Sequence, residues 1–322
     1  MLLQIGITVV RRSPVLYFSG MLLLACSTIS RAVTLNGFVL DETSIPVEQI
    51  VKGGPPRDGI PAIDSPRFVA KNKAGFLKDT ERVLGIVING EAKAYPIKIL
   101  DWHEVVNDSI GSRSFVISYC PLCGTGMAFN ANEGDVILKF GVSGLLYQSD
   151  VLLYDRNTES LWSQVMGRSI SGKLNGKTLR QLPMAHTTWK DWRQRYPKTR
   201  VLTTETGYRR DYSRSPYLGY EHSPRLYFGV SNEAPDRYHP KELVMGLEMD
   251  GHFKAYPFVE LSKKALSHFN DNFNDTPITV VWNEEARSAY ITDAEGNELV
   301  TTIAYWFAWY TFHPQTAIYS PP

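Results

Sequence analysis

The first half of the chain contains hydrophobic runs of the length and composition of β-strands. Residues 83–88 read Val-Leu-Gly-Ile-Val-Ile, and a second strand-like run covers residues 91–96. Between them lies Asn89-Gly90, a pair that tolerates the positive φ angles of a tight turn. We therefore predict a β-hairpin over residues 83–96.

Other segments have the pattern of short helices and loops. Apolar residues at helical spacing predict a short helix within 97–108, and residues 115–118 form a strand-like run that leads into a cysteine. A second short helix is predicted over 187–196, with Thr187 or Thr188 as its N-cap. Residues 205–240 are rich in Tyr, Arg, Ser and Pro, which is typical of a long surface loop that acts as a lid or binds a ligand.

The hairpin pattern occurs a second time, 161 residues further on. The matching positions are Gly85/Gly246, Gly90/Gly251, Ala94/Ala255, Tyr95/Tyr256 and Pro96/Pro257. We predict an internal duplication, about residues 82–130 and 243–292. The expected fold class is α+β and β-rich, with two pseudo-repeated β-containing halves and short helices.

The N-terminal segment has the pattern of an export signal. Arg11 and Arg12 precede an apolar run, 15–25, which is too short for a comfortable membrane span. The run ends in Leu-Leu-Ala before Cys26, as in a bacterial lipobox. We predict a lipoprotein-type signal peptide over 1–25, with Cys26 lipidated. An ordinary secretory signal cut nearby and an uncleaved anchor are the alternatives.

The rest of the chain divides into a lead-in and one domain. Residues 26–66 are expected to form a tether and irregular lead-in, and residues 67–322 the domain that carries the duplication. The protein is predicted to be exported and held in the cell envelope, at the periplasmic face or the cell surface, by a lipid anchor. The composition is that of a soluble globular domain, and a net charge of +1 gives no electrostatic reason to expect a nucleic-acid partner.

Two cysteines remain if Cys26 is lipidated, and they lie in Cys120-Pro121-Leu122-Cys123-Gly124. Proline and glycine favour a tight loop that brings the two sulfur atoms to one side. The second copy has Asn283-Glu284-Glu285-Ala286 instead. The fold therefore does not need the thiols in both copies, which favours a functional site in the first.

Three kinds of chemistry suit this pair: a metal site, a thiol–disulfide redox pair and a structural disulfide. One such loop supplies only two thiolates, so a metal site needs further ligands. His103 is the first candidate ligand, Met127 and His313 are possible additional ligands, and His186 is a further candidate. Two cysteines with His or Met suit copper or zinc. The residues after Cys123 favour a strand over a helix, so no helix dipole would lower a thiol pKa.

The sequence favours copper or zinc binding in an envelope trafficking or redox-support role. The alternatives are a non-catalytic envelope module with a local disulfide and a thiol–disulfide oxidoreductase. Whether the protein is an enzyme is left open.

Several motifs in order are similar to the DUF3179 family, over roughly residues 60–318. They are Tyr95-Pro96, 101–108 (Asp-Trp-His-Glu-Val-Val-Asn-Asp), 119–125 (Tyr-Cys-Pro-Leu-Cys-Gly-Thr), 140–147, 154–164 and 306–309 (Trp-Phe-Ala-Trp). The resemblance implies an exported bacterial or archaeal protein, and it brings no known activity.

Overall fold

The computed structural model describes residues 2–3, 6, 33–263 and 267–321. Two units separate by their contacts, Met1–Arg31 and Ala32–Pro322, and the second holds all the secondary structure described below. Cys26 and nearly all of the predicted signal peptide lie outside the described residues. Within the described part of the chain, no helix is both long enough and apolar enough to cross a membrane.

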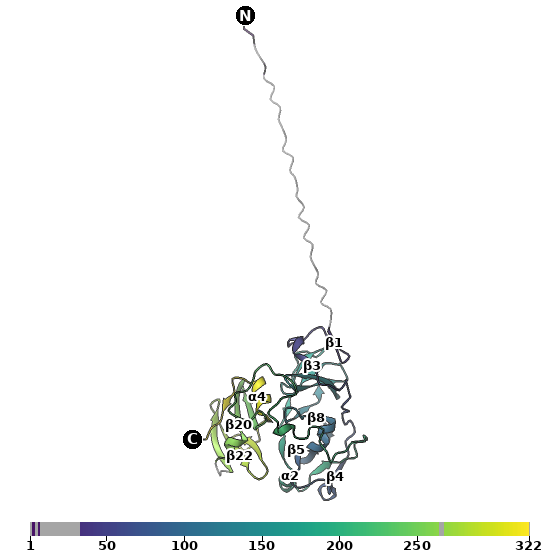
Figure 1. Cartoon of the computed structure of the whole chain (residues 1–322), viewed down its shortest axis with the longest axis vertical. Helices are drawn as coiled ribbons and strands as arrows, with labels where there is room; N and C mark the ends of the chain where they lie inside the picture. The colour runs from purple at the N-terminus through teal and green to yellow at the C-terminus, as the bar shows by residue number, and fades with distance from the viewer. Residues whose placement is uncertain (1, 4–5, 7–32, 264–266, 322) are drawn as a thin grey trace. The chain divides into compact units, whose positions relative to one another are not determined.

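The second unit is built from β-strands, with 42% strand and 12% helix (Figure 1). Five sheets of three to five strands are arranged in the manner of a five-bladed β-propeller. The prediction of an α+β fold with two pseudo-repeated halves is therefore wrong, although the β-rich part of it is confirmed. The helices are short: α1 (Ile97–His103), α2 (Trp189–Arg195), α3 (Phe258–Leu261), α4 (Trp306–Phe312), η1 (Val47–Gln49), η2 (Lys71–Lys73) and η3 (Tyr220–His222).

Each sheet is named here by its central strands. The β5–β6 sheet has the order β17 (Ala185–Thr188), β5 (Arg82–Ile88), β6 (Glu91–Pro96), β18 (Arg200–Leu202) and β4 (Phe68–Ala70). The β8 sheet has the order β16 (Gln181–Leu182), β9 (Thr125–Asn130), β8 (Arg113–Cys120) and β7 (Val105–Ile110). The β12–β13 sheet has the order β15 (Arg168–Ser171), β14 (Leu161–Ser163), β13 (Asp150–Asp155), β12 (Phe140–Tyr147) and β3 (Ile50–Lys52).

The remaining strands form two further sheets and two small hairpins. The β19–β20 sheet has the order β24 (Thr301–Tyr305), β19 (Leu243–Met249), β20 (His252–Pro257) and β25 (Ala317–Ile318). The β22 sheet consists of β21 (His268–Phe273), β22 (Thr276–Asn283) and β23 (Ser288–Thr292). The hairpins are β1 (Val33–Leu35) with β2 (Phe38–Leu40), and β10 (Asn132–Glu133) with β11 (Val136–Ile137).

The predicted hairpin and the predicted helix near residue 190 are confirmed. Strands β5 and β6 turn at Asn89 and Gly90, both with positive φ. Helix α2 begins after Thr188, whose side chain accepts a hydrogen bond from the Asp191 backbone N–H. The helix predicted within 97–108 ends at His103, because the β-branched residues that follow pair with β8 as strand β7.

The two similar segments of sequence form two similar pairs of sheets, and this explains why halves were expected. In one pair Lys93 and Tyr95 contact the carboxylate of Asp108 at 2.9 and 2.6 Å. The corresponding contacts in the other pair are Lys254 and Tyr256 with Asp271, at 2.6 and 2.9 Å. The β12–β13 sheet has no counterpart among the described strands, so the arrangement is not two halves.

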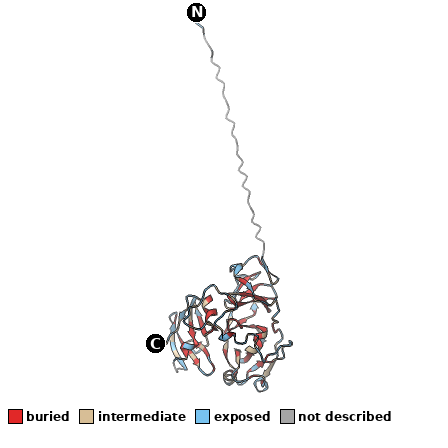
Figure 2. Ribbon diagram, in the orientation of Figure 1, coloured by how far each residue is buried: buried red, intermediate tan, exposed pale blue. Residues whose placement is uncertain are grey.

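The hydrophobic core lies between the sheets, and buried residues fill the facing strands (Figure 2). One large buried cluster contains Cys120, Cys123 and Met127 together with Trp162 and Trp306. Its members come from the β8, β12–β13 and β19–β20 sheets and from α4. The cysteine loop therefore lies inside the part of the core where several blades meet.

Candidate metal site

Cys120 is the last residue of β8 and is paired with Thr125, the first residue of β9, so residues 121–124 form the connecting loop. The Cys123 backbone N–H donates to the Cys120 carbonyl at 3.2 Å, and the Cys123 carbonyl accepts from the Tyr305 N–H at 2.8 Å. Gly124 closes the loop with φ +59°, and a Cβ atom there would lie 2.8 Å from the Tyr305 ring. Backbone geometry therefore fixes both sulfur atoms.

The tight turn between β12 and β13 places a carboxyl group against this loop. Tyr147 pairs with Asp150, and the two residues between them, Gln148 and Ser149, have φ angles of 54° and 65°. Residues other than glycine rarely adopt positive φ angles unless neighbouring groups hold the backbone there. Residues with this backbone conformation concentrate at functional sites. The Gln148 side chain supplies that support through Ser231 and Thr311, so the long loop and α4 hold the turn.

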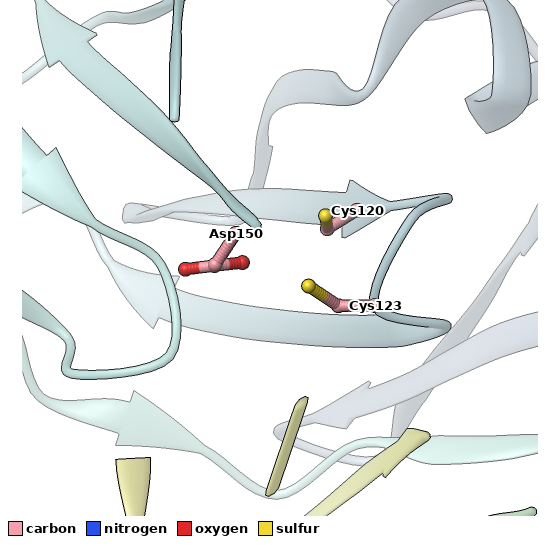
Figure 3. A group of neighbouring side chains, drawn as sticks. All are labelled: Cys120, Cys123 and Asp150. Carbon is pink, nitrogen blue, oxygen red and sulfur yellow. The ribbon is translucent and has the colours of Figure 1, made fainter. Parts of the chain in front are cut away.

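The two sulfur atoms and a carboxylate oxygen of Asp150 all lie within 4.8 Å of one another (Figure 3). Cys120 ends β8, Cys123 lies in the loop between β8 and β9, and Asp150 begins β13. Cys120, Cys123 and Asp150 are 1%, 0% and 0% exposed, so this is an enclosed cluster. We call these three residues the Cys–Cys–Asp site.

Burial controls the charges of this site. It raises the pKa of Asp150 to about 7, although the Val165 and Val151 backbone N–H groups act in the opposite direction. Burial also raises the pKa of the Cys120 thiol, and it raises that of Cys123 well above its ordinary value. Without a cation, both thiols are therefore protonated at neutral pH, and Cys123 donates a weak hydrogen bond to the Ser149 carbonyl at 3.4 Å.

Two oxygen atoms beside the cysteine hairpin lack partners. Asp150 Oδ2 accepts from the Val165 N–H at 3.0 Å, whereas its Oδ1 is buried without a hydrogen bond among the described residues. The Gln164 side-chain NH2 donates to Ser118 at 2.9 Å, and its Oε1 is likewise buried without a partner in the described part of the chain. Unsatisfied buried acceptors are rare in folded proteins and call for an explanation.

A second buried acid belongs to the surroundings of this site. Glu104 follows α1 with φ 56°, and burial raises its pKa to about 8. The Tyr217 hydroxyl donates to its Oε1 at 3.2 Å. Asp150 and Glu104 were not predicted as site residues from the sequence, although both lie in or beside the motifs that carry the family resemblance.

The structure does not bring His103 to the cysteines. Both ring nitrogens are engaged elsewhere, Nδ1 with the Pro61 carbonyl at 2.7 Å and Nε2 with the Tyr212 hydroxyl at 2.7 Å. His103 is fully buried and ties the lead-in segment to the long loop. With both nitrogens occupied, it cannot also hold a metal ion in this conformation.

The other candidate ligands lie in different surroundings. Met127 shares the buried cluster of the cysteines. His313 is stacked on Phe253 and packed against Trp309, with ring centroids 4.1 and 4.2 Å away, and burial lowers its pKa to about 4. His186 lies on β17, and its ring is packed edge-on against the ring of Tyr119, with the two ring centroids 6.5 Å apart.

Comparison with known proteins gives one match. The family model described as "Protein of unknown function (DUF3179)" matches residues 57–316. No curated protein and no solved structure matches the chain. Since the matched segment covers most of the 322 residues, the chain belongs to the DUF3179 family.

Proposed function

We propose that the Cys–Cys–Asp site binds a transition-metal ion, with zinc as the best fit. The supporting observation is the convergence of three ligand atoms within 4.8 Å in an enclosed part of the core. Without a cation both thiols are protonated. A bound divalent ion would stabilise the two thiolates beside the Asp150 carboxylate and would give Oδ1 of Asp150 the partner it lacks.

The type of donor favours zinc over copper. Zn²⁺ is bound by thiolate, imidazole and carboxylate ligands, whereas Cu(I) is selected by soft sulfur ligands alone. The proposed set of two sulfurs and one oxygen therefore suits Zn²⁺. Tetrahedral zinc takes four ligands, so one position is left for water, a substrate or a further side chain. Cu(I) could be held by the two thiolates and would leave the carboxylate uncoordinated.

The buried thiols fit the competing interpretations less well. Thiol–disulfide oxidoreductases depend on a lowered thiol pKa, whereas burial raises the pKa of both cysteines here. A local disulfide would join two sulfur atoms that are free thiols in this structure. A catalytic thiol or a structural disulfide therefore has less support than a metal site.

The cellular role is proposed from the sequence alone. The lipobox pattern at Cys26 supports export and a lipid anchor, and a zinc site in an anchored envelope protein suits metal trafficking or redox support. Radioactive palmitate labelling of the wild-type protein and Cys26→Ala tests the anchor. Label on the wild type that is absent from the variant supports it, and equal labelling of the two contradicts it.

Competition titration with a chromogenic zinc chelator tests the site. The full-length protein should bind one zinc ion per chain, and Cys120→Ser and Cys123→Ser should abolish binding. Asp135→Asn is the control, because Asp135 is an exposed carboxylate in the turn between β10 and β11. Met127→Leu should retain zinc binding, and loss of binding in a folded Met127 variant would instead show that its thioether is a ligand.

A further inference from the structure

A cavity of about 450 Å³ adjoins the cysteine loop. Tyr119, Pro121 and Gly124 contribute to one wall, and Tyr217 and Leu218 of the long loop contribute to another. A volume in this range suits a small organic molecule. None of the three residues of the Cys–Cys–Asp site lines this cavity, so a ligand could bind in it whether or not a metal ion is bound.

Arg82 places a guanidinium group in the wall of this cavity. Nη1 donates to the carbonyls of Ala286 and Arg287 at 2.6 and 3.1 Å, and Nη2 donates to the His186 carbonyl at 2.8 Å. These bonds use three of the five guanidinium hydrogens. The Nε hydrogen and one Nη2 hydrogen have no acceptor among the described residues.

Arg82 also lacks a counter-ion. In the described part of the chain, no carboxylate lies within salt-bridge distance of it, and burial lowers its pKa to about 10, so it remains charged. Arg287, which also lines the cavity, is 3.7 Å from Glu242. Buried positive charges are normally paired, and Arg82 is only half-buried, so its two free N–H groups are able to take an anion from solvent.

Part of the remaining lining fits an apolar body. Tyr119, Tyr305 and Leu243 provide aromatic and aliphatic surface, and the lining also includes the charged residues Asp101, Glu221, Lys241 and Glu242. His186 lies beside Arg82 and is 6% exposed, and its Nδ1 is buried without a hydrogen-bond partner among the described residues. Burial holds its pKa well below the ordinary value, so the ring is neutral and can donate or accept one more hydrogen bond.

We propose that this cavity binds a small organic carboxylate whose carboxyl group pairs with Arg82. The planar guanidinium presents adjacent N–H groups that match the two oxygens of a carboxylate. The ring or chain of the ligand lies against the tyrosines, and the imidazole of His186 is placed to take a further hydrogen bond. The long loop that carries Tyr217 and Leu218 covers the bound molecule.

Calorimetric titration of the full-length protein with a panel of carboxylates and their amides tests this proposal. The probes are acetate, succinate, benzoate and 3-phenylpropionate, each beside its uncharged amide. At least one acid should bind with a dissociation constant on the order of 1 mM or below, and its amide should bind at least about tenfold more weakly. Equal binding of acid and amide, or no binding by any acid, overturns the proposal.

Variants and a heavy-atom probe locate the site. Arg82→Lys should weaken the acid at least about tenfold, whereas Arg168→Lys, an exposed arginine outside the cavity, should not. Crystals soaked with 4-iodobenzoate should show the iodine signal inside the cavity and the carboxylate beside Arg82. This measurement does not depend on whether an Arg82 variant folds, and an iodine site elsewhere alone contradicts the proposal.

Discussion

The Cys123 thiol lies 3.4 Å from the carbonyl oxygen of Ser149, so the cysteine loop touches the turn that carries Asp150. The two elements belong to different sheets. Their contact therefore depends on how the blades pack, and it creates the group of donors on which the proposed function rests. The following predictions test the parts of this arrangement separately.

Asp150→Asn should weaken zinc binding while leaving the fold intact. The amide oxygen can still accept from Val165, but it carries no charge and is a poor zinc ligand. Substitutions beside metal ligands already cost about 10–100-fold in affinity, so loss of a ligand should cost at least that much. Chelator competition measures the affinity, and circular dichroism checks the fold. Unchanged affinity in a folded variant contradicts the assignment of Asp150.

Zinc binding should release protons. Burial raises the pKa of both thiols, so at pH 7 they are protonated before binding and must lose about two protons to become ligands. Apparent affinity should therefore rise as the pH rises from 6 to 8. Calorimetry in buffers of different ionisation enthalpy gives the number of protons released. Fewer than one proton per zinc ion would show that the thiols are not the ligands.

Gln148→Ala should loosen the turn before Asp150. The Gln148 amide donates to Gln49 and Ser231 and accepts from Ser231 and Thr311. Loss of these bonds should lower the free energy of unfolding by about 1–3 kcal/mol and weaken zinc binding as well. Urea unfolding and metal titration measure the two effects. Gln194→Ala on α2 is the control, and a Gln148 variant that behaves like it would show that the turn needs no such support.

The contribution of Glu104 to the stability of the metal-free protein should fall as the pH rises from about 4.5 to 8. Burial raises the pKa of Glu104 from its ordinary 4.5 to about 8, so its carboxyl group binds more protons in the folded state than in the unfolded state between these values. This contribution therefore falls with rising pH across this window and levels off above it. Urea unfolding at several pH values should show a smaller slope for Glu104→Gln. An identical slope would mean that Glu104 is not held protonated by the fold.

Gly85→Ala should destabilise the domain. A Cβ atom at residue 85 would lie 2.4 Å from the ring of Trp192, and the corresponding atom at Gly246 would lie 2.1 Å from Trp309. Such overpacking costs typically about 1–3 kcal/mol, and thermal unfolding measures it. Gly75→Ala is the control, because the space around Gly75 is open. Equal stability of the two variants would show that the packing of Trp192 does not depend on a glycine at residue 85.

Local features of the fold could be predicted from the sequence, and contacts between blades could not. Asn89-Gly90 predicted its hairpin because the turn chemistry is contained in two residues. The prediction of two halves was wrong because the matching segments form two pairs of sheets. Residues 140–171 build most of the β12–β13 sheet, and no other segment of the sequence matches them.

The site shows the same limit. The cysteine pair was visible as a motif, but Asp150 follows a turn of Gln and Ser that carries no ordinary turn signal. Its approach to residues 27 and 30 positions earlier is a consequence of packing alone. His103 was predicted as a ligand because it lies in the motif just before the cysteine strand. Its two partners, Pro61 and Tyr212, lie 42 and 109 residues away, so the sequence does not reveal that both ring nitrogens are engaged.

X-ray absorption at the zinc edge of the zinc-loaded, full-length protein tests the central claim most directly. We predict two sulfur ligands at about 2.3 Å and oxygen ligands at about 2.0–2.2 Å, and no zinc retained by the Cys120→Ser, Cys123→Ser double variant. A shell made only of nitrogen and oxygen, or a shell unchanged in that variant, would show that zinc is not bound by the Cys–Cys–Asp site.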